Sequence, residues 1–495
     1  MRTNNIFNHK KLMFLFLIGS IGFTGCKKFL DINQNPNNPD SADPSLLLPT
    51  VQAADGQIVG NAFQVLGNIY AEYWTQSPSA SQYKVVEQYV QANSYYDRVW
   101  NTIYRNALVN AQLIINNKGA GLEYTKGMAY VLKAYTYQVA TDAFGDIPLT
   151  QALQGNAYGS PKYDTQQAVY DSVFNYIDKG IALLNTKTSV SPGNQDLIFK
   201  GDVSKWIAFA NTLKLRAYLR ISYKDAAKAK AGIAALYQTN PTFVAQDAAI
   251  QYSTVGGNEN PFYNEMVGLG KTQNVVASGT AVLALKSNND PRLRKLYNKV
   301  PSDNTPAGDT IAYILQGTYQ QNPTKKVSFP TPLVAGDAND PASATVPVKL
   351  ISLSESYFLQ AEAVARGFAV GDATALFKSG VTTSFTATGL TAADANTYLA
   401  SAPDANIAGA VSLEDKIKII ITQKYYAMNG LQGFEAWTEY RRTGYPTFLV
   451  VSKASLLGAG LMPQRFIYPN SEVTTNLSYP GTVPVTTPLW WDTTN

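Results

Sequence analysis

Long amphipathic segments recur in pairs along the chain, and they limit its fold more than any other feature of the sequence. In residues 97–117, apolar side chains return every three or four positions and form one face of a helix. Residues 124–140 repeat the pattern after a short break. This spacing predicts helical hairpins rather than a fold built mainly of strands, in which apolar residues would alternate.

The same design continues toward the C-terminus. Asp164 is placed to cap a third helix with Gln167 at its third position, and residues 206–217 form an apolar stripe for a partner helix. Further helices are expected at 352–366 and 413–428. We therefore predict a mainly α fold of tetratricopeptide-like helical hairpins with minor β structure, although the strict period of that repeat is absent.

Two loop-rich stretches interrupt the helices, at about 236–350 and about 446–495. Loops of this length inside a domain usually serve a function or contact a partner. Residues 27–49, rich in Asn and Pro, are expected to form a tether ahead of the first long helix near residue 97. No linker divides the rest, so residues 26–495 are expected to form a single domain.

The N-terminus has the pattern of a lipoprotein signal peptide. Basic residues precede a short apolar run at 12–18, and small residues stand directly before Cys26, the only cysteine of the chain. We predict cleavage after residue 25 and lipidation of Cys26, which would anchor the protein in a membrane. The alternative is an ordinary secreted protein with a free thiol, which is unusual in an exported chain.

Composition removes most catalytic chemistry. The single histidine, His9, lies within the predicted signal peptide, so the mature chain has neither a His-dependent triad nor a conventional His/Cys metal site. Catalysis by carboxylates alone remains open. Our prediction is nevertheless a protein without enzyme activity, cofactor or metal. Basic residues are dispersed rather than clustered, which argues against nucleic acid as a partner.

The surface is instead suited to neutral polar ligands, since 15% of residues are charged and 31 are tyrosines. Sugars bind to aromatic faces flanked by amides. The best candidates for such a site precede the first predicted long helix, and they are Tyr73, Trp74, Gln76, Gln82 and Tyr83. The alternative is that Tyr73 and Trp74 anchor their loop to the core, as most of the tyrosines are expected to do.

Two acidic groups have structural as well as chemical interpretations. Glu435 and Glu439 could be the carboxylate pair of a glycosidase, but their spacing on one helix, with Arg442 three residues further on, favours a local ion-pair network. Asp142 and Asp146 straddle a Gly turn and are expected to cap backbone amides rather than to bind a metal.

Several motifs together resemble the SusD/RagB family of outer-membrane nutrient-binding lipoproteins. They are KFLDINQNPNNP at 28–39, TDAFGDIP at 141–148, LSESYFLQAEA at 353–363, GFEAWTEYRRTGYP at 433–446 and PQRFIYP at 463–469. The resemblance implies a SusD-like fold and an outer-membrane location, with the lipid-anchored protein facing the cell exterior over a SusC-like, TonB-dependent barrel.

The resemblance also implies a function and further site residues. The protein would capture a nutrient, most often an oligosaccharide and sometimes a peptide, and deliver it to the barrel. Ligand contacts in this family also come from mid-chain loops, which adds Asn260, Phe262, Tyr263 and Tyr319 to the candidates. A peptide-binding member, a surface glycosidase and a helical-repeat scaffold are the alternatives.

Overall fold

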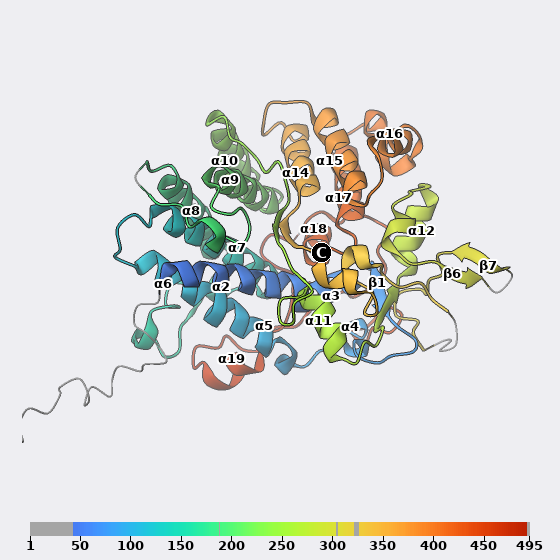
Figure 1. Ribbon diagram of the computed structural model, residues 1–495, viewed down its shortest axis with the longest axis horizontal. Coiled ribbons are helices and arrows are strands. Elements are labelled where there is room, and N and C mark those ends of the chain that lie inside the picture. Colours follow the sequence, from blue (N-terminus) through green and yellow to red (C-terminus); the bar gives the residue numbers. More distant parts are fainter. Residues whose placement is uncertain (1–42, 188, 303–304, 321–325, 493–495) are drawn as a thin grey trace, which may run out of the picture. The chain divides into compact units, whose positions relative to one another are not determined.

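Helical hairpins make up most of the fold, as the periodicity predicts (Figure 1). The computed structural model describes residues 43–187, 189–302, 305–320 and 326–492, and Pro44–Asn495 form one unit by their contacts. Cys26 and the predicted signal peptide, residues 1–25, lie outside the described residues. Among the described helices, none combines the length and the apolar character that crossing a membrane requires.

The predicted helices form close to their expected positions. The 97–117 segment is one continuous helical stretch of α5 (Asp97–Asn101), η3 (Thr102–Leu108) and α6 (Val109–Asn116). The other predicted helices are α7 (Glu123–Phe144), α8 (Gln166–Leu184), α9 (Val203–Arg220), α14 (Leu353–Ala365) and α17 (Leu413–Met428). Further helices are α4 (Lys84–Glu87), α10 (Ala226–Gln238), α11 (Pro261–Gly268), α12 (Gly279–Ser287), α13 (Leu293–Leu296), α15 (Ala373–Ala387), α16 (Ala392–Ser401), α18 (Gly433–Thr443) and α19 (Asn470–Thr475).

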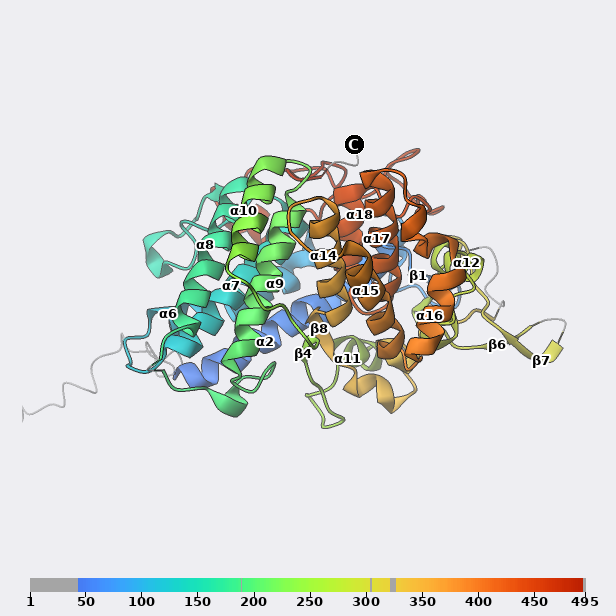
Figure 2. The same cartoon turned by 90° about the horizontal axis from the view of Figure 1, so that it is seen from above.

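Two groups of packed helices are seen in Figure 2, α6 to α10 in one and α14 to α17 in the other. In the first group, α7 packs along α8, and α8 along α9. In the second, α14 packs along both α15 and α17. Each helix buries its apolar stripe against its neighbours, which is the arrangement that the sequence pattern predicts.

A long N-terminal helical segment connects the two groups. It consists of α2 (Pro44–Gln57), the π-helical turn η1 (Ile58–Ala62) and α3 (Phe63–Tyr70). α2 contacts α6 and α7, whereas α3 packs on α18 (Figure 1). The predicted tether is therefore wrong at its C-terminal end, because α2 already begins within it. The periodicity of apolar residues does not predict α2, because this helix is buried on most sides, for example at 51–52 and 54–56.

Short antiparallel strand pairs fasten the loop-rich regions to the helices. β1 (Trp74–Gln76) pairs with β5 (Val275–Ala277), and β4 (Ala248–Ile250) pairs with β8 (Val348–Ile351). The other pairs are β2 (Ile147–Pro148) with β3 (Tyr163–Asp164) and β6 (Val300–Ser302) with β7 (Thr305–Thr310). Because β1 pairs with β5, residues near 75 lie next to residues near 276, in the loop-rich stretch 236–350.

A buried network of charged side chains joins α7, α9, α14, α17 and α18. Arg220 is 1% exposed and pairs with Asp142 at 3.2 Å, with Glu435 at 2.5 Å and with Glu439. Lys424 lies 3.2 Å from Glu439. Burial alone would raise the pKa of Glu439. The charges of Arg442, Lys424 and Arg220 outweigh burial and hold this pKa well below its ordinary value.

The network confirms one part of the predicted local pairing and corrects another. Arg442 contacts Glu439 within α18 at 2.7 Å, as the spacing predicts. Glu435, in contrast, pairs with Arg220 on α9 and contacts Lys424 on α17, so it joins separate helices instead of fixing one helix end. Glu435 and Glu439 are both buried among cations. The two carboxylates of a glycosidase would instead lie across an open cleft.

The predicted binding of backbone amides is wrong for Asp142 and confirmed for Asp146. The Asp142 carboxylate accepts no hydrogen bond from a backbone amide of the described residues. It accepts from the hydroxyl of Tyr170 at 2.6 Å and the indole of Trp491 at 2.9 Å. Asp146 does accept from a backbone N–H, that of Gln166 at 3.0 Å.

The cap of α8 is Thr165, whose side chain accepts from the backbone N–H of Ala168. Asp164 instead accepts from the backbone N–H groups of Leu149 and Thr150, next to the β2–β3 pair. The predicted cap is thus one residue too early, because a tertiary contact takes the Asp164 carboxylate.

A buried acid in α2 should make stability depend on pH. Asp55 is fully buried, and burial raises its pKa to about 8, although a hydrogen bond from Thr136 partly opposes the shift. Between the ordinary pKa of 3.8 and about 8, the unfolded chain ionises Asp55 while the folded protein keeps it neutral. Its contribution to stability is therefore full below pH 4 and is lost as the pH rises through 8.

Asp55→Asn should remove this loss. We expect the free energy of unfolding of the variant, relative to the unsubstituted protein, to increase by several kcal/mol between about pH 5 and about pH 9. Urea unfolding at both pH values measures the difference, and any effect of the substitution on packing cancels between them. Parallel pH profiles of the two proteins would contradict the buried, neutral acid.

Candidate functional site

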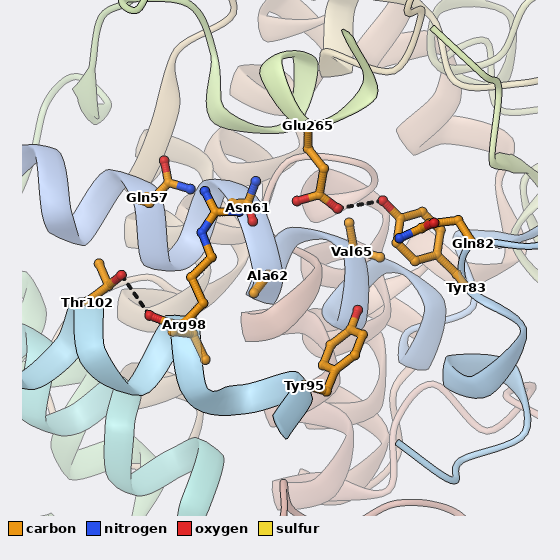
Figure 3. A pocket seen from close by; sticks show the side chains of 11 residues that line it. Gln57, Asn61, Ala62, Val65, Gln82, Tyr83, Tyr95, Arg98, Thr102 and Glu265 are labelled. Atoms are coloured by element: carbon orange, nitrogen blue, oxygen red, sulfur yellow. Dashed lines mark hydrogen bonds between the residues drawn. The ribbon is translucent and has the colours of Figure 1, made fainter. Parts of the chain in front are cut away.

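A pocket of about 140 Å³ lies where the N-terminal helical segment, the α5–η3 segment, the loop before α4 and α11 meet (Figure 3). We call it the π-flanked pocket. Its lining is Gln57, Asn61, Ala62, Val65, Gln82, Tyr83, Tyr95, Arg98, Val99, Thr102 and Glu265. These residues come from four separate parts of the chain, which the fold brings together.

Two of the helical segments that border the pocket depart from α-helical geometry next to it. Asn61 and Ala62 belong to the π-helical turn η1, and Thr102 begins the π-helical turn η3. π-Helical turns are rare and are found frequently at functional sites, since they cost helix stability and reorient the side chains around them. Two of them at one pocket favour a binding role for it.

The walls of the pocket combine charged groups, amides and aromatic rings. The Glu265 carboxylate accepts a hydrogen bond of 2.7 Å from the hydroxyl of Tyr83. Arg98 extends from the facing helix toward Gln57 and Asn61, and the Tyr95 ring lies below Glu265 (Figure 3). Such a lining offers hydrogen-bond donors and acceptors beside apolar surface, as the binding of a sugar requires.

Two of the predicted ligand residues line this pocket, and four others support its walls. Gln82 and Tyr83 are lining residues. Gln76 is buried, and its side-chain oxygen accepts from the backbone N–H of Tyr83 at 2.6 Å, which fixes the position of the tyrosine.

The supporting residues also position α11, which carries Glu265. Trp74 stacks on Phe262 with ring centroids 5.2 Å apart, and both rings are buried. Asn260 caps the helix, because its side-chain oxygen accepts from the backbone N–H groups of Phe262 and Tyr263. Trp74 is fully buried, which is what an anchoring role in the core requires, and its contact with a ligand stays a prediction.

Three predicted residues lie away from the pocket lining. Tyr73 is buried, and its hydroxyl donates to the carbonyl of Tyr425 at 2.5 Å. Tyr319 is buried in a small apolar cluster with Val276 and Ile314. Tyr263 is half-buried on α11. Contact of these residues with a ligand stays a prediction.

The sequence analysis does not predict the wall of the pocket formed by the N-terminal helical segment, nor the role of Arg98 in its lining. Gln57, Asn61, Ala62 and Val65 belong to the helical segment that the periodicity does not detect. Arg98 is on the polar side of a predicted helix, where a solvated cation is ordinary. The one signal for Arg98 in the sequence is its position on a polar helix face close to an aromatic residue, Tyr95.

The two largest of the other described cavities differ from the π-flanked pocket in their lining. One of about 550 Å³ is lined by Leu283, Leu315, Phe448 and Val450 beside a few polar groups, so its wall is mainly apolar. Another, of about 340 Å³, lies between α14, α15 and α17. Neither is bordered by a π-helical turn, and neither is lined by a residue that the sequence analysis proposed as a ligand contact.

Residues 36–469 match the model of the SusD-like family, whose description is starch-binding and associating with the outer membrane. The chain belongs to the SusD-like family. The predicted resemblance is thereby confirmed, and with it a non-catalytic binding role at the outer membrane. No curated protein sequence matches the chain.

Solved structures of SusD homologues confirm the SusD-like fold. A chitin-binding protein is 25% identical, with a TM-score of 0.76, over 91% of this chain and 100% of that one. A chitin-binding SusD homologue from Flavobacterium johnsoniae is 23% identical, with a TM-score of 0.74, over 91% and 98% of the two chains. A SusD/RagB family protein from Bacteroides thetaiotaomicron is 24% identical, with a TM-score of 0.76, over 91% and 99%.

Proposed function

We propose that this SusD-like protein captures an oligosaccharide in the π-flanked pocket and delivers it to a SusC-like, TonB-dependent barrel. The observation that carries the proposal is the lining of the pocket, in which tyrosines, amides, Arg98 and Glu265 converge between two π-helical turns. A sugar ring presents C–H faces to aromatic rings and hydroxyl groups to amides and charges, so its chemistry matches this lining.

Family membership and the chitin-binding relative support a glycan over the other ligand classes. The test is calorimetric titration of the purified protein with hexasaccharides and with peptides of mixed sequence. We expect saturable binding of a glycan without the release of shorter sugars. Binding of peptides alone would favour a peptide-binding member, cleavage would favour a glycosidase, and ligand-independent complexes with several proteins would favour a scaffold.

The barrel would contact the loop-rich surfaces of residues 236–350 and 446–495. Among the described residues, α19 is the one α-helix of the second stretch, whereas the first also holds α11, α12, α13 and the short strands β4 to β8, so it contains more regular structure than its composition predicts. Capture by this protein alone would not move a nutrient across the membrane, so the function needs a channel as partner. We therefore expect the channel to contact these loops rather than the two helical groups.

Lipidation of Cys26 would hold the protein at the outer surface of the outer membrane. We expect Cys26→Ala to block processing or to release the protein from membranes, since the acyl chains would be lost. Membrane fractionation with and without detergent measures the change, and Thr24→Ser, which keeps a small residue before the cleavage site, serves as the control. Unchanged detergent-dependent partitioning of Cys26→Ala would contradict lipidation.

A further inference from the structure

The π-flanked pocket holds two opposite charges that no described partner neutralises. Arg98, on α5, forms no ion pair with another described residue, and neither does Glu265, on α11. One oxygen of Glu265 accepts from Tyr83, and the other has no hydrogen bond to a described residue. The two side chains extend into the pocket from different walls (Figure 3).

Some arginines in the interior contact a carboxylate directly, whereas Arg98 is exposed and Glu265 is half-buried. Arg292 pairs with Asp290 at 2.5 Å, and Arg366 pairs with Glu362 at 2.7 Å. In these two pairs, the opposite charges are in direct contact. A separated cation and anion on two walls of one small pocket fit a role in binding better than a role in folding.

Glu265 is also held in place by the residues around it. The Tyr83 hydroxyl fixes one carboxylate oxygen, Gln76 fixes the backbone of Tyr83, and the Trp74–Phe262 stack together with the Asn260 cap positions α11. A carboxylate that is prevented from turning presents its free oxygen in one direction, which favours a single donor group on the ligand.

We infer that the pair recognises the acetamido group of an N-acetylated amino sugar, with Glu265 accepting from its N–H and Arg98 donating to its carbonyl. An amide has one donor and one acceptor at opposite ends, which matches an anion on one wall and a cation on the other. This inference rests on the proposed glycan-binding function and assigns its ligand class. A glucan offers hydroxyl groups alone, and they do not require both charges.

The test compares three hexasaccharides by calorimetry with the purified protein: N-acetylchitohexaose, its deacetylated form and cellohexaose. They share the β-1,4 backbone and differ at the second carbon. We expect N-acetylchitohexaose to bind at least about tenfold more tightly than cellohexaose, because charge-assisted hydrogen bonds are about twice as strong as neutral ones. Glu265→Gln should reduce this preference, whereas Glu259→Gln, an identical substitution outside the pocket lining, should not.

Each other outcome overturns the inference in a recognisable way. Equal affinity for N-acetylchitohexaose and cellohexaose, unaffected by Glu265→Gln, would leave glycan capture standing and remove acetamido recognition. Tighter binding of the deacetylated form would show that Glu265 selects an ammonium group instead. Failure of every glycan to bind would overturn the proposed function and the inference together.

Discussion

Arg220→Met is expected to lower the free energy of unfolding by about 3–5 kcal/mol, the usual cost of breaking a buried ion pair by removing one partner. Arg220 is the common partner of Asp142, Glu435 and Glu439. Without it, these carboxylates keep the cost of burial and lose a neighbouring cation. Methionine fills a similar volume, so the effect reports charge rather than a cavity.

The pH dependence of this loss gives a second readout. In the unsubstituted protein, cations hold the pKa values of Glu435 and Glu439 below their ordinary values against the opposing effect of burial. Their stabilisation is therefore present at neutral pH and is lost as the pH falls through the folded-state pKa values. In Arg220→Met the same pKa values rise, so the variant should recover part of its deficit at acidic pH.

Urea unfolding at pH 5 and pH 8 measures both effects. Arg105→Met is the control, since Arg105 is exposed and should change stability by less than about 0.5 kcal/mol. A loss of stability in Arg220→Met no larger than that of the control would show that the network contributes little. A loss that is the same at both pH values would contradict the pKa argument.

Gly67→Ala is expected to destabilise the protein by roughly 3 kcal/mol, at the upper end of the usual cost of overpacking. A Cβ atom on Gly67 would lie 2.0 Å from the backbone nitrogen of Phe434, at the crossing of α3 and α18. Because the obstacle is backbone rather than a flexible side chain, the two helices must separate. Their separation would disturb the α18 residues that pair with Arg220.

Gly268→Ala is a matched control for this substitution. Gly268 also lies in a helix, but a Cβ atom there would meet nothing within 4 Å. This change should be neutral or stabilising by up to about 1 kcal/mol, because alanine favours the helix. Thermal unfolding of the two variants compares them directly, and equal melting temperatures would contradict the close helix crossing.

The sequence predicts those helices best whose apolar face and cap are both local. α17 begins and ends at the predicted residues, since Ser412 and Asp415 form a capping box and the apolar stripe faces one neighbour group. The N-terminal helical segment is missed because it is buried on most sides and carries Pro49 inside α2. This segment is buried by contacts with residues far away in the chain. The local spacing of apolar residues carries no information about such contacts.

The candidate site is predicted in part for the same reason. Aromatic and amide residues near 76–83 and 260–262 point to the region of the π-flanked pocket, because binding loops concentrate such side chains. The sequence does not show that Trp74 and Phe262 stack on each other in the interior, nor that Glu265 and Arg98 reach the same pocket. The strand pairing of β1 with β5 brings these segments together, and strands this short leave little trace in a sequence.

The most direct test of the account fills the π-flanked pocket. Ala62 lines it, and an indole at this position would occupy the space proposed for the sugar. Ala53→Trp places the same side chain at an exposed position of the same helical segment and serves as the control. Calorimetric titration with N-acetylchitohexaose should show binding by Ala53→Trp equal to that of the unsubstituted protein, and binding at least about tenfold weaker by a folded Ala62→Trp. Unchanged affinity of folded Ala62→Trp would contradict glycan capture in this pocket.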